Sequence, residues 1–245
     1  MHNALPAAIS NSEFFALYQP QISVADGRIV AAEALLRWQR PGVGIVQPSE
    51  FVRFAEENGL IDPIGTYILQ MACREAAAWP DLRVAVNVSQ KQFARPNLAD
   101  FICEIARVAG LPLNRLEIEV TETAAFPDIN HAIAELKTLR ARGVLVSLDD
   151  LGSGGATMEL MAQLPLDRVK IGRELVGKYA EAEGAARLRT LIAAAQKSGL
   201  GVTAEGIETQ AERDFLSDLG SDQMQGFLFA QPMSAQELQA LMGAR

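Results

Sequence analysis

The sequence predicts a modified (β/α)8, TIM-like barrel, an α/β fold, whose opening strand is antiparallel to the next one. Short β-branched segments alternate with segments of helical periodicity along the whole 245-residue chain. The dipeptide Asp26-Gly27, which is typical of a tight hairpin turn, separates the first two strand-like segments. After this hairpin a strand–helix pattern repeats six times. The result is eight strands with helices to cover them, which is the pattern of a barrel.

The expected elements follow in order along the chain. Strands are expected at 14–24, 28–38, 84–89, 116–120, 144–149, 168–171, 201–205 and 223–229. Helices are expected around 64–72, 98–109, 132–142, 185–198, 210–219 and 235–242, where apolar residues recur at helical spacing. An open doubly wound sheet is the alternative fold. Such a sheet usually carries a glycine-rich phosphate loop after its first parallel strand, and Ser89-Gln90-Lys91-Gln92 is not one.

The amino-acid composition and net charge indicate the class of protein. Hydrophobic residues make up 49% and charged residues 21% of the chain, as in a globular protein rather than a disordered one. No linker-like stretch divides the chain, so we expect a single domain over 1–245 with its core from 14 to 242. The net charge of −8 argues against binding DNA through a broad basic surface.

The cellular location is predicted from what the sequence lacks. Cys73 and Cys103 are too few for a disulfide framework and do not have the spacing of a zinc site, so we expect buried thiols. No run of eighteen apolar residues and no charged-then-apolar N-terminal segment occurs. We therefore expect a cytoplasmic protein with no membrane contact by this segment.

Polar residues stand near the carboxyl ends of the expected strands, where a barrel places its active site. They are Glu33, Asn87, Glu119, Asp149 with Asp150, Lys170, Glu205 and Gln225. Strand alternation sets Glu119 opposite Ile118 and Val120, so it points to the barrel axis if the apolar face packs on the helices. A single acid at a strand end is usually a helix cap or a solvated loop residue. One polar residue on each consecutive strand is much harder to obtain by chance.

Carboxylates that converge on the barrel axis repel one another and lose hydration, so a cation must lie among them. An all-oxygen donor set is the one that Mg²⁺ and Mn²⁺ prefer. The adjacent Asp149 and Asp150 offer ligands to two ions, as in two-metal phosphoryl-transfer sites.

Seven motifs in a fixed order cover nearly the whole chain. They are Ala32-Glu33-Ala34-Leu35-Leu36-Arg37-Trp38, Asn87-Val88-Ser89, Glu119-Val120-Thr121-Glu122, Asp149-Asp150-Leu151-Gly152, Val169-Lys170-Ile171, Ala204-Glu205-Gly206-Ile207-Glu208 and Gln225-Gly226-Phe227-Leu228-Phe229. The tripeptide Glu-Ala-Leu alone means nothing, but the ordered set is highly specific. It resembles the EAL-domain family, which hydrolyses the bacterial second messenger cyclic di-GMP.

The resemblance implies metal-dependent hydrolysis of cyclic di-GMP to linear 5′-pGpG with two Mg²⁺ or Mn²⁺ ions. The residues that resemble ligands of the first ion are Glu33, Asn87, Glu119 and Asp149, and those of the second are Asp149 and Asp150. Lys170 resembles the lysine that holds the attacking water, and Glu205 the carboxylate that accepts its proton.

The resemblance also implies substrate-binding and supporting residues. Leu35 would line the dinucleotide groove, and Arg37 would bind a substrate phosphate with two N–H groups. Glu122 would anchor the loop after Asp149-Asp150, while Glu208 and Gln225 would support the site.

Two departures from the family pattern stand out. The loop 151–157 has three glycines in four residues, which raises the entropic cost of ordering it. Gly172 stands where the family usually has an acid after Lys-Ile. Both departures bear on the turnover rate rather than on the identity of the ligands.

Two other functions compete with hydrolysis of cyclic di-GMP. One is a catalytically weak or silent cyclic di-GMP receptor, and the other is a metal-dependent barrel that acts on a different phosphoester or carbonyl substrate. As partners, the resemblance implies a homodimer and an upstream sensory or GGDEF domain in a longer parent chain.

Overall fold

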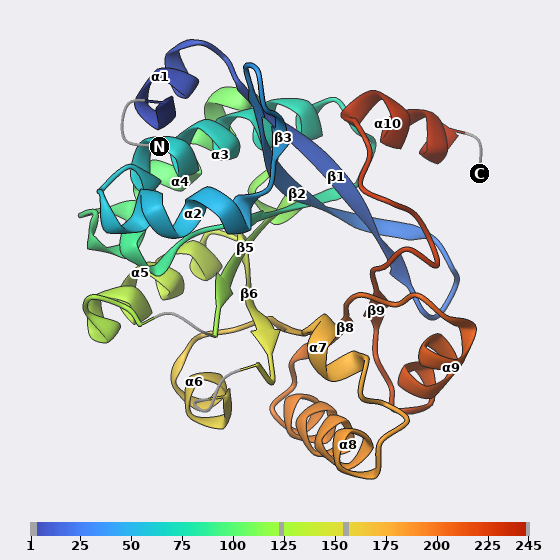
Figure 1. Ribbon diagram of the computed structural model, residues 1–245. Coiled ribbons are helices and arrows are strands. Elements are labelled where there is room, and N and C mark those ends of the chain that lie inside the picture. The colour runs from blue at the N-terminus through green and yellow to red at the C-terminus, as the bar shows by residue number, and fades with distance from the viewer. Residues whose placement is uncertain (1–3, 123–124, 154–156, 244–245) are drawn as a thin grey trace.

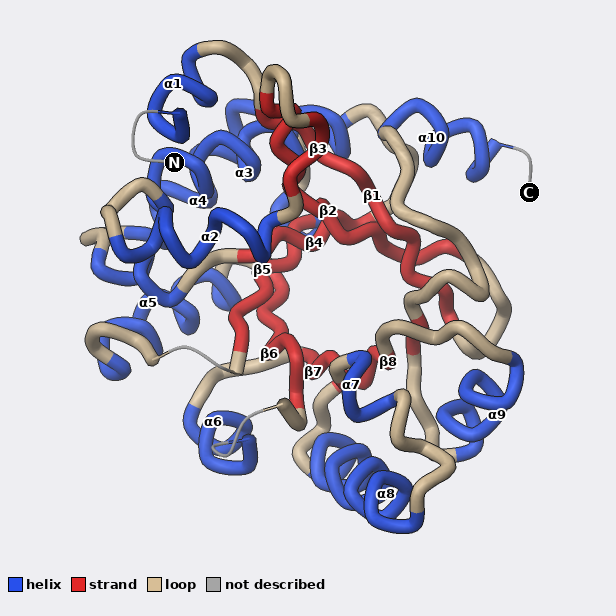
Figure 2. Tube along the Cα trace, in the orientation of Figure 1, coloured by secondary structure: helices blue, strands red, loops and turns tan. Residues whose placement is uncertain are grey.

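The computed structural model describes residues 4–122, 125–153 and 157–243. Eight strands close into a barrel that is seen end-on in Figure 1, with helices around its outside. Figure 2 shows the same arrangement as a ring of strands inside a ring of helices. The predicted modified (β/α)8 barrel is confirmed.

The opening strand is antiparallel to both of its neighbours. β1 (Phe14–Ser23) pairs with β2 (Ile29–Arg40) on one side and with β9 (Gln223–Met224) on the other. The parallel strands between them follow in chain order: β4 (Arg83–Asn87), β5 (Leu116–Thr121), β6 (Leu145–Leu151), β7 (Arg168–Ile171) and β8 (Gly201–Ala204). A short additional strand, β3 (Gly44–Val46), pairs with β2.

The turn between β1 and β2 lies at the predicted dipeptide. Gly27 has a φ of +70°, a conformation that glycine adopts without steric cost. The Gly27 N–H donates to the Ser23 carbonyl, and the Arg28 N–H donates to the Asp26 carboxylate. These bonds close the hairpin and set the register that places Gln19 opposite Glu33.

All six expected helices are present. They are α3 (Ile61–Ala77), α4 (Leu98–Ala109), α5 (Ile129–Ala141), α8 (Ala182–Lys197), α9 (Gln210–Asp218) and α10 (Ala235–Gly243). Further helices were not expected from periodicity: α1 (Ala4–Ser10), α2 (Pro48–Glu57), α6 (Thr157–Gln163), α7 (Arg173–Val176) and the 3₁₀ turns Gln90–Ala94 and Leu113–Arg115. Most of these are too short to show a helical period.

The last expected strand, 223–229, is wrong in its length, because β9 ends at Met224. After Met224 the chain turns around Ile207, whose N–H donates to the Gln225 carbonyl and whose carbonyl accepts from the Leu228 N–H. Gly226 allows this close approach, since a Cβ there would lie 2.1 Å from the Ile207 carbonyl oxygen. The apolar residues at 227–229 therefore form a turn, not a strand.

The hydrophobic core lies outside the barrel, between its strands and the helices. Ile118 and Val120 of β5 belong to this core, and Cys73 and Cys103 are buried thiols as expected. The barrel interior is polar instead. Buried polar residues on its strands are Gln19, Gln21, Glu33, Glu117, Glu119, Ser147, Lys170, Thr203 and Gln223.

A second, smaller core joins α1 and α2 to the end of the hairpin. Trp38 is its largest side chain and packs edge-on against Phe51 with ring centroids 5.7 Å apart. Among the described residues, no helix combines the length and the apolar character needed to span a bilayer.

Candidate active site

A buried lysine lies at the centre of the predicted site. Lys170 of β7 is fully buried, and its ammonium contacts carboxylates from four other strands or strand ends. The distances from Lys170 Nζ are 2.7 Å to Glu119 Oε1, 2.7 Å to Glu205 Oε1, 3.3 Å to Glu33 Oε2 and 3.4 Å to Asp149 Oδ1. The structure thus brings five of the predicted site residues into one cluster.

Strand pairing explains why these side chains meet. Asn87 pairs with Glu119 across β4 and β5, and Thr121 pairs with Asp149 across β5 and β6. Because side chains of a strand alternate between faces, Glu119 points into the barrel while its neighbours point to the helices. Lys170 follows the same rule on β7, between the buried Val169 and Ile171.

Amide side chains hold the cluster in place around Glu33. Asn87 Nδ2 donates to Glu33 Oε1 at 2.8 Å and to Glu119 Oε2 at 3.3 Å. Gln225 Nε2 donates to Glu33 Oε2 at 2.8 Å and to Gln19 Oε1 at 3.0 Å. Both oxygens of Glu33 are therefore hydrogen-bonded from opposite sides.

Burial and charge shift the pKa values within the cluster. Burial lowers the pKa of Lys170, but the four carboxylates outweigh burial and raise it well above its ordinary value. Burial raises the pKa of Glu205 to about 8 and that of Glu119 well above its usual range. Burial also acts to raise the pKa of Glu33, yet Lys170 and the amide hydrogen bonds bring it below its ordinary value. The surrounding carboxylates therefore favour the charged form of Lys170.

The donor set fits hard divalent cations. Within the described residues no three Asp, Glu, His or Cys side chains form a group that holds an ion as they stand, and the Lys170 ammonium occupies the space between the carboxylates. Glu119 Oε1 and Asp149 Oδ1 are buried and both contact the single Lys170 ammonium. Four carboxylates face one ammonium, so the cluster retains acidic oxygens that a divalent ion would satisfy.

A pocket opens next to the cluster at the carboxyl end of the barrel. Leu35 and Arg37 of β2 line it, together with Glu205, Glu208 and Gln225. Arg37 is half-buried, and its Nη1 donates to the Leu36 carbonyl at 2.8 Å. The predicted substrate-binding residues therefore adjoin the predicted catalytic ones.

Glu119 and Glu122 lie three residues apart and make different contacts. Glu119 faces Lys170, whereas Glu122 Oε2 accepts a hydrogen bond from the Gly152 N–H at 2.8 Å. Glu122 is thus in contact with the loop that follows Asp149-Asp150. Gly154 and Gly155 of the same loop lie outside the described residues.

Asp150 is the one predicted metal ligand that stands apart. Among the described residues, the ion pairs of Lys170 include Asp149 but not Asp150. Asp150 has a φ of +59°, and the β6–β7 pairing shifts between Leu148 and Leu151. This irregularity turns the two adjacent carboxylates in different directions.

Three residues of the site were not predicted from the sequence. Gln19 accepts the hydrogen bond from Gln225, and its position opposite Glu33 in the hairpin register is the signal that could have identified it. Arg173 lines the pocket and forms an ion pair with Glu208. Phe227 lines the pocket with half of its surface exposed. It was not predicted because residues 223–229 were expected to form a strand.

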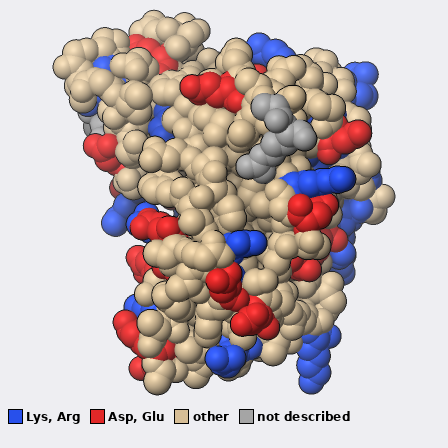
Figure 3. Space-filling model, turned by 90° about the vertical axis from the view of Figure 1, so that its right-hand side faces the viewer, with Lys and Arg blue, Asp and Glu red and all other residues tan. Residues whose placement is uncertain are grey.

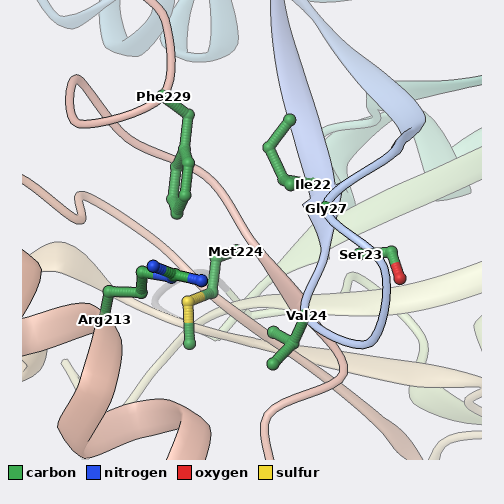
Figure 4. Close-up of a pocket in the computed structure, with 7 residues that line it drawn as sticks. All are labelled: Ile22, Ser23, Val24, Gly27, Arg213, Met224 and Phe229. Carbon is green, nitrogen blue, oxygen red and sulfur yellow. The ribbon is translucent and has the colours of Figure 1, made fainter.

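A second pocket lies where β1 and β9 meet, and Arg213 of α9 reaches toward Met224 there (Figure 4). None of its lining residues belongs to the predicted site. The face drawn in Figure 3 shows acidic and basic side chains interspersed, with no continuous basic surface.

Known proteins resemble this chain in sequence and in fold. The sequence profile of the EAL domain matches residues 2–232. A solved structure of the PaMucR phosphodiesterase in complex with c-di-GMP superposes with a TM-score of 0.90 at 34% identity, over 97% of this chain and 98% of that one.

Two curated relatives come from Pseudomonas aeruginosa. MucR, a bifunctional diguanylate cyclase/cyclic di-GMP phosphodiesterase, is 35% identical over 96% of this chain, and the match covers 35% of MucR. The cyclic di-GMP phosphodiesterase NbdA is 35% identical over 100% of this chain and is covered to 32%. The chain thus spans about a third of the length of these relatives. On the strength of the profile match, the barrel and the ordered site residues, the chain belongs to the EAL domain family.

Proposed function

We propose that this chain hydrolyses one phosphodiester bond of cyclic di-GMP and releases linear 5′-pGpG. The observation that carries the proposal is the group of four carboxylates around buried Lys170, beside a pocket lined by Arg37. Similarity to relatives that are named cyclic di-GMP phosphodiesterases supports the choice of substrate.

Divalent ions are part of the proposal. The residues that would hold a first Mg²⁺ or Mn²⁺ ion are Glu33, Asn87, Glu119 and Asp149, and those for a second are Asp149 and Asp150. When bound, such ions acidify water and offset the negative charge that develops on the phosphoryl oxygens. They would also supply local positive charge for binding an anion to a chain of net charge −8.

The protein side chains then have distinct roles. Arg37 binds a substrate phosphate through its guanidinium, and Leu35 lines the groove for the rest of the dinucleotide. Lys170 stays protonated, so it orients the attacking water and offsets charge rather than acting as a base. Gln225 supports the site by hydrogen-bonding to Glu33.

Glu205 is the proposed general base. Its Oε1 lies 2.7 Å from Lys170 Nζ, so both groups reach the same water position. A base must be ionised, and burial raises the pKa of Glu205 to about 8. Positive charge lowers the pKa of a nearby carboxyl, so divalent ions held beside Glu205 would favour its basic form.

A second candidate function is binding of cyclic di-GMP without turnover. The position of Asp150 outside the Lys170 cluster favours this receptor function, because it leaves the second ion with fewer ligands. The longer relatives also lead us to propose an upstream sensory or GGDEF domain. Homodimer formation stays a prediction of the resemblance, and a cytoplasmic location stays a prediction from the sequence pattern.

A direct experiment separates the candidates. The protein is incubated with cyclic di-GMP and Mg²⁺, Mn²⁺, Ca²⁺ or a chelator, and the nucleotides are separated by chromatography. We expect 5′-pGpG with Mg²⁺ or Mn²⁺ and binding without turnover in Ca²⁺, which prefers longer bonds and more ligands. Binding without product in every metal identifies a receptor, and absence of binding contradicts both functions.

A further inference from the structure

The Asp150 carboxylate occupies the space that a side chain on Gly172 would fill. A Cβ added to Gly172 would lie 2.1 Å from Asp150 Oδ1 and 3.3 Å from Asp150 Cγ. The distance to Oδ1 is far below van der Waals contact, so Asp150 in its present rotamer and any side chain at residue 172 exclude each other.

The backbone of Gly172 does not require glycine. Its φ of −65° and ψ of 149° are ordinary extended values at the start of α7, which any residue adopts. The missing Cβ therefore has one structural consequence, which is room for Asp150. The backbone is not displaced by a methyl group, because Asp150 Cα would be 3.4 Å away.

This arrangement separates Asp150 from Asp149. Asp149 Oδ1 is 3.4 Å from Lys170 Nζ, whereas Asp150 turns to the gap beside residue 172. Asp150 has few staggered alternatives, and a carboxylate expelled from the gap is attracted by the Lys170 ammonium two residues before Gly172. Expulsion therefore favours a position nearer to Asp149.

We propose that residue 172 is a positioning residue that controls how Asp150 serves the second divalent ion. The inference rests on the proposed function. Glycine lets Asp150 withdraw into the gap, so the second ion is bound weakly. A methyl group at residue 172 closes the gap and returns the carboxylate to the ion, which tightens the second site without adding a ligand.

The contact itself is tested in the absence of metal. Thermal unfolding with a chelator is compared for wild type, Gly172→Ala, Asp150→Gly and the double variant. We expect Gly172→Ala to lower Tm by about 2–4 °C, because the displaced carboxylate joins an acidic cluster. In the Asp150→Gly background the same methyl group should have no such effect, and glycine accepts the φ of +59° at residue 150 without strain.

Gly177→Ala is the matched control. It adds the same methyl group five residues away, at a φ of −59°, where a Cβ meets only the Arg173 carbonyl oxygen at 3.5 Å and the Glu174 carbonyl oxygen at 4.0 Å. It therefore reports the general effect of replacing glycine by alanine. We expect its ion binding to equal that of wild type.

The consequence for the ion is tested by calorimetric titration with Mn²⁺. We expect wild type to bind one ion tightly and a second weakly, and Gly172→Ala to bind the second about tenfold more tightly. The double variant should lose this gain. Two outcomes overturn the inference alone, provided that wild type binds Mn²⁺ and hydrolyses cyclic di-GMP. One is that the Tm changes of the two single variants add up in the double variant. The other is that Gly172→Ala binds the second ion no more tightly than wild type does. Absence of Mn²⁺ binding in every protein overturns the inference and the proposed function together.

Discussion

Two layers of charged side chains lie inside the barrel, one near each end of the parallel strands. The layer at the carboxyl ends consists of Lys170 with Glu33, Glu119, Asp149 and Glu205. The layer at the amino ends consists of Glu117 with Arg83 and Arg168, and Arg83 Nε lies 3.9 Å from Glu117 Oε2. Glu117 and Glu119 are two residues apart on β5 and are both buried.

The two layers differ in charge balance rather than in burial. Four acids surround one cation at the carboxyl ends, whereas at the amino ends Glu117 lies between Arg83 and Arg168 and further carboxylates act on Arg168. Burial lowers the pKa of Arg168, and the carboxylates of Glu117, Asp222 and Asp167 oppose this effect. The layer at the amino ends thus obtains its counter-charges from other side chains of the protein. The layer at the carboxyl ends has one cation for four acids, and this shortage of positive charge favours a cationic ligand there.

The largest expected effect is on Lys170. Lys170→Met should lower hydrolysis by about 10⁴-fold, since it removes the cation that orients the water. It should also lower the free energy of unfolding by about 3–5 kcal/mol without metal, because four buried carboxylates lose their partner. Chromatographic turnover and denaturant unfolding measure both. Added Mn²⁺ should restore part of the stability. If the variant is as stable as wild type in the presence of a chelator, the four acids do not depend on Lys170 for positive charge.

Glu119→Gln and Glu117→Gln compare the layers directly. Glu119→Gln should lower hydrolysis by about 10³-fold and leave the metal-free protein at least as stable, since it removes one of four mutually repelling acids. Glu117→Gln should keep hydrolysis and lose about 1–3 kcal/mol of stability, because two guanidiniums lose a counter-charge. Turnover and unfolding are measured for both variants. The reverse pattern shows that charge balance does not distinguish the layers.

Glu122→Ala tests whether Glu122 lies outside the layer at the carboxyl ends. The variant should keep tight Mn²⁺ binding and binding of cyclic di-GMP in Ca²⁺, because Glu122 contacts the Gly152 loop instead of Lys170. Turnover should fall by about 10–100-fold as the loop loses its anchor. Calorimetric metal titration beside a turnover assay measures both. Loss of tight Mn²⁺ binding, or full turnover, contradicts this division of roles.

Arg37→Lys has the smallest expected effect. A lysine keeps the charge but cannot donate two parallel N–H groups to a phosphate, so KM should rise about tenfold while metal content stays normal. Arg37→Ala should raise KM further. Steady-state kinetics with metal analysis provides the measurement, and an unchanged KM in the alanine variant removes Arg37 from the substrate site.

Local periodicity was enough to predict the barrel strands and six of the helices. Alternation along β5 also predicted that Glu119 faces inward, because the direction of a side chain on a strand depends only on its place in the alternation. Helices such as α1 and α7 were missed, since seven or four residues do not show a helical period. The end of β9 was missed because packing around Ile207, not β propensity, turns the chain there.

The site divides in the same way. Strand-end position and the ordered motifs are sufficient to predict Glu33, Glu119, Lys170 and their neighbours as candidate site residues. Only the closed barrel decided that Lys170 contacts four acids at once, that Gln19 joins Gln225, and that Asp150 turns into the gap beside Gly172. The sequence determined which side chains face inward because alternation is local. The tertiary structure decided which of them meet, because such contacts depend on strand register, on the irregular pairing of β6 and on the volume left by a glycine just after another strand.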